Sequence, residues 1–157
     1  MKVTIIEADS IEQIDMAREL FLEYEKELNV DLCFQGFAEE LKSLPGKYAL
    51  PDGALLLAME QTEAVGCVAL RRFSATDAEM KRLYLRSSYR HLGVGRQLAE
   101  SIIDRARNLG YRRMVLDTLA TMQTAQALYR SLGFASIDAY YVNPLPGVIY
   151  FAKVLAR

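Results

Sequence analysis

The order of strands and helices that the sequence predicts indicates an α/β or α+β domain around a mixed, mostly antiparallel sheet. Apolar runs at 54–60 and 64–73 are joined only by a short Gln-Thr-Glu connection, which is the pattern of an antiparallel hairpin. Strand-like stretches at 78–85 and 114–118 flank a helical stretch, which is the pattern of a parallel crossover. Because one domain usually takes about 100–200 residues, we expect residues 1–157 to form a single domain.

The first part of the chain predicts one strand and two helices. Residues 3–6 have the pattern of a short strand. Ser10 is a typical N-cap residue, and Gln13 three positions later completes a capping box. Apolar residues then recur at helical spacing, which predicts a helix over 11–28. A loop and a short second helix follow, and Pro45-Gly46 ends that helix.

Glycines mark the ends of the helices in the second part of the chain. The helix of the crossover begins at Gly93-Val94-Gly95 and ends at Gly110, because a glycine is the commonest residue just past a helix C-terminus. Gly133 ends a further helix in the same way. The remaining predicted elements are the helix near 122–132 and two final strands at about 134–141 and 148–154.

The composition excludes several classes of protein. Apolar residues make up 52% of the chain, and a formal net charge of −1 argues against a nucleic-acid binder. Two cysteines and one histidine suggest neither a disulfide framework nor a zinc site, so no metal is expected. The N-terminus resembles no signal peptide, and no apolar run reaches the ~18 residues of a membrane span. We therefore expect a cytoplasmic protein without nucleic-acid or membrane partners.

The small net charge hides an uneven distribution of charge along the chain. Residues 1–63 hold 5 basic and 14 acidic side chains, a net charge of −9. Residues 64–157 hold 14 basic and 6 acidic side chains, a net charge of +8. The basic half is suited to a polyanionic ligand, and the acidic half to a cationic one.

The most informative stretch joins the strand at 78–85 to the helix that follows it. The loop reads Arg90-His91-Leu92-Gly93-Val94-Gly95, and glycines let the backbone approach a ligand closely. The first turn of a helix has unpaired N–H groups and a partial positive charge, so this turn is suited to phosphate, with added charge from Arg90 and Arg96. A turn that merely connects the two elements is the alternative. Nucleotide-binding motifs fit poorly, because a P-loop needs Lys-Ser/Thr and a Rossmann fingerprint needs a third glycine where Leu98 stands.

Arg90 to Gly95 resembles the R/Q-x-x-G-x-G/A motif of the GNAT superfamily of acyl-CoA-dependent N-acetyltransferases. Residues 81–85 (KRLYL) are similar to the fourth strand of that family, and residues 125–134 to its second motif. The resemblance covers nearly the whole chain and implies a sheet splayed between its fourth and fifth strands, with flanking helices. Met122 departs from the family pattern, because many members have there an asparagine that contacts the cofactor.

The resemblance implies that acetyl-CoA is the co-substrate. Its pantetheine arm is expected in the splay, paired with the backbone of Leu83, Tyr84 and Leu85. Its pyrophosphate is expected on the backbone amides of the loop and first helical turn. That set comprises His91, Leu92, Gly93, Val94, Gly95 and Arg96, preceded by Arg90. Dimers are common in the family, so a homodimer is compatible with the resemblance.

Direct acyl transfer needs a neutral amine, whereas a free lysine-type amine has a pKa near ~10.4. Glu79 is the candidate general base, because it lies at the offset from Arg90 where some family members carry a glutamate base. A solvent-facing glutamate, or one that pairs with Lys81 or Arg82, is the alternative, and a water chain can then serve as the base. By resemblance, Tyr129 is the candidate general acid near the cofactor sulfur, and a core aromatic is the alternative. The backbone N–H of Leu85 is the candidate donor to the oxyanion.

The acceptor pocket implied by the resemblance forms from about 22–38 and 138–148. The first segment carries Glu23 and Tyr24 among several acidic residues, and the second carries Tyr141. Acidic and aromatic side chains hold a cationic amine by charge and cation–π contact, so a small-molecule or peptide amine is the expected acceptor. A solvated acidic helix face is the alternative.

The sequence therefore predicts an acetyl-CoA-dependent N-acetyltransferase that moves the acetyl group to a primary amine by direct attack. The alternative from another class is a catalytically silent, acyl-CoA-binding regulatory module. The presence of both Glu79 and Tyr129 favours the enzyme.

Overall fold

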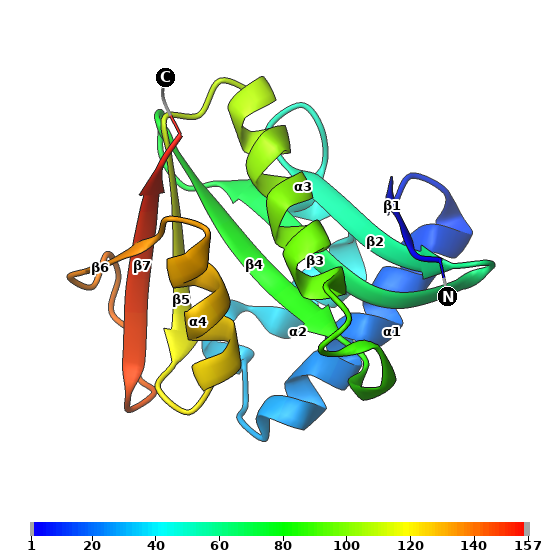
Figure 1. Ribbon diagram of the computed structural model, residues 1–157, viewed down its shortest axis with the longest axis horizontal. Coiled ribbons are helices and arrows are strands. Elements are labelled where there is room, and N and C mark those ends of the chain that lie inside the picture. Colours follow the sequence, from blue (N-terminus) through cyan, green and yellow to red (C-terminus); the bar gives the residue numbers. More distant parts are fainter. Residues whose placement is uncertain (1, 156–157) are drawn as a thin grey trace.

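In the computed structural model, which describes residues 2–155, one seven-stranded sheet is covered by helices on both faces (Figure 1). The strand order is β1-β2-β3-β4-β5-β7-β6, and only β4 and β5 pair in parallel. The mixed, mostly antiparallel sheet is thereby confirmed, with its elements in the predicted order. They are β1 (Thr4–Glu7), α1 (Ile11–Leu28), α2 (Phe37–Ser43), β2 (Ala54–Glu60), β3 (Glu63–Arg72), β4 (Asp77–Leu85), α3 (Val94–Asn108), β5 (Arg113–Leu119), α4 (Gln123–Ser131), β6 (Ala135–Ile137) and β7 (Val148–Val154).

The first helix begins where its capping residues indicate. The Ser10 hydroxyl accepts from the backbone N–H of Gln13, and the Gln13 side chain accepts from the backbone N–H of Ser10. This capping box satisfies donors that have no partner within the helix. At the other end, Asn29 adopts a left-handed conformation with φ of 54° and ends α1.

The prediction of a strand over 134–141 is wrong at its C-terminal end, since β6 covers only Ala135–Ile137. The residues after it contain Tyr140 and Tyr141, whose hydroxyls donate to Glu79 and Asp117. Successive side chains of a strand point to opposite faces. Two adjacent tyrosines that both reach into the same cluster therefore need an irregular backbone, and the strand stops before them.

Two apolar cores lie on the two faces of the sheet. Strand β2 divides between them by alternation. Ala54, Leu56 and Ala58 pack on the face covered by α3, whereas Leu55, Leu57 and Met59 pack on the face covered by α1. The continuous apolar run in β2 therefore reflects a central strand that is buried on both faces.

Strands β4 and β5 diverge, and their divergence creates the main opening in the sheet (Figure 1). They pair only at Asp77–Glu79 against Arg113–Val115, although β4 continues to Leu85 and β5 to Leu119. The expected splay between the fourth and fifth strands is confirmed. A bulge adds to the curvature of β4, where the register with β3 shifts and Arg82 adopts a φ of 62°.

The uneven charge distribution is largely matched inside the molecule. Basic residues of the second half pair with acidic residues of the first, so that the helices α1 and α2 are tied to β4 and its following loop. The most buried of these pairs is Arg82 with Glu40. The other pairs between the halves are Arg72–Asp52, Arg86 with Glu19, Glu23 and Glu63, Arg90–Glu27 and Arg105–Glu7.

Candidate active site

The loop before α3 presents unpaired backbone donors. His91 and Gly93 have φ of 65° and 82°, and this left-handed backbone turns the chain into the helix. Among residues 2–155, no acceptor bonds the amides of Val94, Gly95 and Arg96. A Cβ built on Gly95 meets nothing closer than a methyl of Leu128 at 3.9 Å, so the space beside this glycine is open. The predicted residues therefore form an accessible anion site of backbone N–H groups.

The two arginines of the predicted motif have partners of their own. Arg90 pairs with Glu27 at 2.6 Å and donates from Nε to the carbonyl of Leu85 at 2.9 Å. Arg96 donates to the hydroxyl of Ser131 at 2.6 Å. The positive character of the loop thus rests on the helix N-terminus, with the guanidinium groups bound at its sides.

The end of β4 turns backbone groups toward the opening. The N–H of Arg86 donates to the carbonyl of Val65 on β3 at 2.9 Å. Because backbone groups alternate along a regular strand, the N–H of Tyr84 faces β3 and that of Leu85 faces away from it, toward the splay, whereas Leu83 directly follows the bulge at Arg82. The predicted backbone residues are therefore at an open strand edge, where an extended ligand can pair with them.

A cleft lies between the diverging strands β4 and β5, and Tyr129 on α4 forms part of its wall. Its lining includes Tyr24, Met80, Leu116, Asp117 and Tyr129. The Tyr129 hydroxyl has no hydrogen-bond partner among the described residues. It is also not sealed off, since no fully buried polar side-chain atom in 2–155 lacks a partner. Burial raises the pKa of Tyr129 above its ordinary value, which keeps the hydroxyl protonated at neutral pH. Burial likewise raises the pKa of Tyr24 to about 12.

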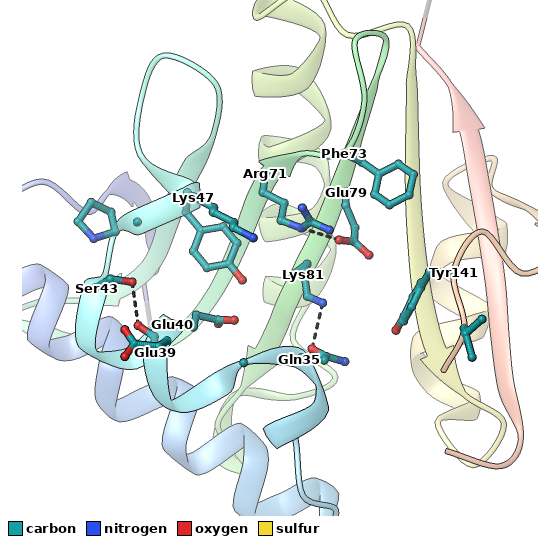
Figure 2. Close-up of a pocket in the computed structure, with 15 residues that line it drawn as sticks. Gln35, Glu39, Glu40, Ser43, Lys47, Arg71, Phe73, Glu79, Lys81 and Tyr141 are labelled. Atoms are coloured by element: carbon teal, nitrogen blue, oxygen red, sulfur yellow. Dashed lines mark hydrogen bonds and ion pairs between the residues drawn. The ribbon is translucent and has the colours of Figure 1, made fainter. Parts of the chain in front are cut away.

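A second cavity of about 460 Å³ lies beside the cleft, between α2 and the strands β3 and β4 (Figure 2). Both spaces include Gln35 and Lys81 in their linings, so they meet at these two side chains. The other charged residues around the second cavity are Glu39, Glu40, Lys47, Arg71 and Glu79. We call this space the α2 cavity.

Glu79 lies in the wall of the α2 cavity, and its side chain is held on both oxygens. Arg71 is its directly opposite neighbour on β3, and the Arg71 Nε donates to Oε1 at 2.8 Å. The hydroxyl of Tyr140 donates to Oε2 at 2.6 Å. Only 1% of Glu79 is exposed, so this fixed carboxylate faces the cavity from a buried position. The salt-bridged alternative is correct in kind, with Arg71 as the partner rather than Lys81 or Arg82.

The bulge in β4 turns Lys81 and Arg82 to the same face of the sheet. Arg82 makes two hydrogen bonds to the Glu40 carboxylate, at 2.9 and 2.8 Å, and lies over the ring of Phe37. Lys81 donates to the side-chain oxygen of Gln35 at 3.0 Å. Burial lowers the pKa of the Lys81 ammonium from its ordinary value. An isolated cation therefore lies where the two spaces meet.

Asp117 forms a third polar centre, on the β5 side of the cleft. Its carboxylate accepts from the hydroxyl of Tyr141 and from the amide of Asn143, the latter at 3.2 Å. Asn143 also donates to the Tyr141 hydroxyl at 2.7 Å. Burial and the bond to Asp117 raise the pKa of Tyr141. The connection between β6 and β7 is thereby fastened to β5.

The predicted side chains divide between the two spaces. Tyr24 and Tyr129 line the cleft, whereas Glu79 and Tyr141 line the α2 cavity. Glu23 lines neither, because its carboxylate binds Arg86 at 2.7 Å and accepts from Tyr84 at 3.3 Å. Arg71, Lys81 and Asp117 are site residues that were not predicted. Arg71 and Asp117 stand in strands and match no motif, and Lys81 belongs to the strand segment 81–85, whose similarity to the family assigned it no role.

Two findings limit other kinds of site. Within residues 2–155, no group of three or more His, Cys, Asp or Glu side chains is arranged to hold a metal ion. None of the helices in the described part has both the length and the apolar content that a bilayer crossing requires.

Comparison with known proteins identifies one family over most of the chain. Residues 14–134 match the model of the acetyltransferase (GNAT) family. An uncharacterized N-acetyltransferase of Schizosaccharomyces pombe is 43% identical over 148 residues, which are 93% of this chain and 91% of the relative. A GNAT-family acetyltransferase structure from Staphylococcus aureus superposes with a TM-score of 0.82 at 22% identity, over 98% of this chain and 99% of the other. The PaiA N-acetyltransferase of Thermoplasma acidophilum, solved in complex with coenzyme A, superposes with a TM-score of 0.74 at 20% identity, over 98% and 99% of the two chains.

Proposed function

The chain belongs to the GNAT family of acetyltransferases, and from this premise we propose that it transfers the acetyl group of acetyl-CoA directly to a primary amine of a small molecule or peptide. The splay between β4 and β5, with Tyr129 in the wall of its cleft and the anion site of α3 following β4 in the chain, is the observation that carries this proposal. Residues 1–157 act as one domain in it.

The residues present fit acetyl-CoA. The unpaired amides of Val94, Gly95 and Arg96 suit its pyrophosphate, and the open space beside Gly95 lets that group approach the backbone. The open edge of β4 from Leu83 to Leu85, where the N–H of Leu85 faces away from β3, suits an extended pantetheine arm. Acetyl-CoA supplies the acyl group in activated form, as a thioester. The chain supplies its orientation, a proton donor and a place for the amine.

Tyr129 holds a proton where the leaving thiolate needs one. Within residues 2–155 no side chain or backbone group competes for its hydroxyl, and its raised pKa keeps the proton in place at neutral pH. The backbone N–H of Leu85 faces the same opening and is the donor we assign to the oxyanion.

Glu79 is the base that we assign on the acceptor side. Its carboxylate is fixed by Arg71 and Tyr140 and faces the α2 cavity, where a small amine has room to bind. Tyr141 contributes to the wall of the same cavity. The bonds from Arg71 and Tyr140 orient the carboxylate and leave each of its oxygens a second lone pair, which can take the proton of the amine.

The test is a turnover screen with acetyl-CoA against amines, amino acids, polyamines and peptides, read as release of free coenzyme A thiol. Acetylation of at least one class, confirmed by the mass of the product, is expected. Tight acetyl-CoA binding by calorimetry, without turnover of any acceptor, would instead indicate a regulatory acyl-CoA-binding module. Absence of acetyl-CoA binding would contradict both functions.

A further inference from the structure

Lys81 differs from every other buried charge around the α2 cavity in lacking an opposite charge. Arg71 pairs with Glu79, and Arg82 pairs with Glu40. Among residues 2–155, no carboxylate makes an ion pair with Lys81, whose ammonium donates instead to the neutral amide oxygen of Gln35. Lys47 also lines the cavity, but it is exposed to solvent.

Two carboxylates that line the same spaces as Lys81 accept hydrogen bonds from other residues. Glu79 accepts bonds from Arg71 and Tyr140 on its two oxygens. Asp117 accepts from Tyr141 and Asn143. Figure 2 shows the Lys81 side chain extending from β4 between Glu79 and Gln35, with its hydrogen bond to Gln35. The ammonium thus points into the cavity and not to a fixed protein anion.

A partly dehydrated ammonium without a counter-ion is unfavourable in a folded protein. The lowered pKa of Lys81 expresses that cost, since burial disfavours the charged form. A carboxylate brought by a ligand removes the cost by forming a charge-assisted hydrogen bond with Nζ. The volume of about 460 Å³ is within the ~300–1,000 Å³ range of small-molecule sites.

We propose that the acceptor amine also carries a carboxylate, which Lys81 binds, so that the acceptor is an amino acid or a close analogue of one. This inference rests on the proposed function and specifies its substrate class. It differs from the cationic acceptor expected from the charge count, because Glu23, Glu27 and Glu40 are bound by arginines of the second half. Within the described residues, the acidic half leaves Glu39, which is exposed to solvent, as the carboxylate of the cavity lining that forms no ion pair.

The test compares acceptors that differ only in the carboxylate. Glycine, L-alanine and L-glutamine are each paired with the corresponding α-amide, with acetyl-CoA saturating and thiol release as the readout. We expect the wild type to have at least a tenfold higher kcat/KM for the acids. Lys81→Met should raise KM for the acids about 10–100-fold and change kcat by less than about threefold, since a charged hydrogen bond is lost. In the comparison of Lys81→Met with the wild type, each acceptor is compared with itself, so differences in amine basicity cancel.

Two further variants separate binding from structure. Lys81→Arg keeps the charge and should restore a large part of the acid preference. Lys42→Met, on the exposed side of α2, removes a lysine that lines neither space and should leave all constants unchanged. The amides should show equal KM in the wild type and in Lys81→Met.

The outcomes distinguish this inference from the proposed function. Turnover by the wild type of amines that lack a carboxylate, in preference to the acids, overturns the inference and leaves acetyl transfer intact; this comparison needs no variant to fold. A fall in kcat for acids and amides alike, with KM unchanged, also overturns it and makes Lys81 a positioning residue. Acetyl-CoA binding without turnover of any acceptor overturns the proposed function and the inference together.

Discussion

The cleft between β4 and β5 and the α2 cavity meet at Gln35 and Lys81, yet they offer a ligand different kinds of groups, backbone in the one and side chains in the other. The cleft offers backbone donors, from the open edge of β4 and the first turn of α3, to a ligand. The α2 cavity is walled by side chains that are fixed in ion pairs and hydrogen bonds, such as Arg71–Glu79 and Arg82–Glu40.

This difference indicates which part of the site determines co-substrate binding and which part determines acceptor specificity. A backbone site depends on turn geometry and on glycine, so it tolerates wide variation in the surrounding side chains. A side-chain site changes its specificity whenever one charge is exchanged, because each buried charge must be matched. We expect changes in the cleft to affect the co-substrate and all acceptors equally, and changes in the α2 cavity to discriminate among acceptors.

The largest effect is expected for Tyr129→Phe, the one side chain of the cleft to which we assign chemistry. The kcat should fall about 10²–10⁴-fold, the usual contribution of a positioned proton donor. The Kd of acetyl-CoA should change by less than about threefold, and all acceptors should be affected alike. Because burial raises the pKa of Tyr129 above its ordinary value, ionisation of this hydroxyl should cause no loss of wild-type kcat below about pH 10.

Tyr111→Phe is the matched control for that variant. The Tyr111 hydroxyl donates to the carbonyl of Asp52 and lines neither space. Its loss should lower the free energy of unfolding by about 1 kcal/mol and leave kcat unchanged. Normal turnover by Tyr129→Phe would remove Tyr129 as the acid.

Gly95→Val tests the backbone part of the cleft and is expected to have the next largest effect. The new methyl groups enter the space that we assign to the pyrophosphate, so the Kd of acetyl-CoA should rise about 100-fold, the loss of one or two charge-assisted bonds. Stability should hold or rise slightly, because glycine within a helix costs up to about 1 kcal/mol relative to other residues. Calorimetric titration and urea unfolding give the two numbers.

Gly95→Ala should be intermediate in binding and more stable than the wild type. A variant that binds acetyl-CoA normally, with valine at this position, would contradict the assignment of the anion site. A variant that unfolds would contradict the finding that the space beside Gly95 is open.

The same contrast between backbone and side chains explains which features the sequence predicts. The capping box of α1 and the glycine turn before α3 are local, so Ser10 and Gly93 indicate them without knowledge of the rest of the fold. The roles of Arg71 and Lys81 depend on sheet register and on the bulge at Arg82. Simple alternation puts Lys81 and Arg82 on opposite faces, whereas the bulge puts them on one.

The end of β6 was mispredicted for a related reason. Tyr140 and Tyr141 have the aromatic character of strand residues. Their hydroxyls donate hydrogen bonds to Glu79 and Asp117, which are distant in sequence, and the backbone at these two residues is not part of β6. Long-range polar contacts of this kind leave no periodic signal along the chain.

Glu79→Gln tests whether the α2 cavity contributes chemistry as well as specificity. Glutamine has nearly the same shape; its one oxygen can accept from Arg71, and its amide can donate to the Tyr140 hydroxyl, so the wall should change little. We expect kcat/KM to fall about 10–100-fold near neutral pH, where the acceptor amine is mostly protonated. The deficit should shrink as the pH approaches the pKa of that amine, ~10.4 for a lysine-type group, because a neutral amine needs no base. A pH profile parallel to that of the wild type would assign the base to a water chain.

The smallest effect is expected for Glu23→Gln, which decides whether the acidic face of α1 belongs to the acceptor site. The carboxylate of Glu23 is 31% exposed, pairs with Arg86 at 2.7 Å and accepts from Tyr84. Loss of this half-exposed pair should lower the free energy of unfolding by about 0–1 kcal/mol, and less at high salt. We expect KM for every acceptor to stay within about twofold, because the side chain lines neither the cleft nor the α2 cavity. A selective rise in KM for cationic acceptors would extend the acceptor site to α1, and it would show that the acidic half of the chain acts on substrate directly and not only through its ion pairs with the basic half.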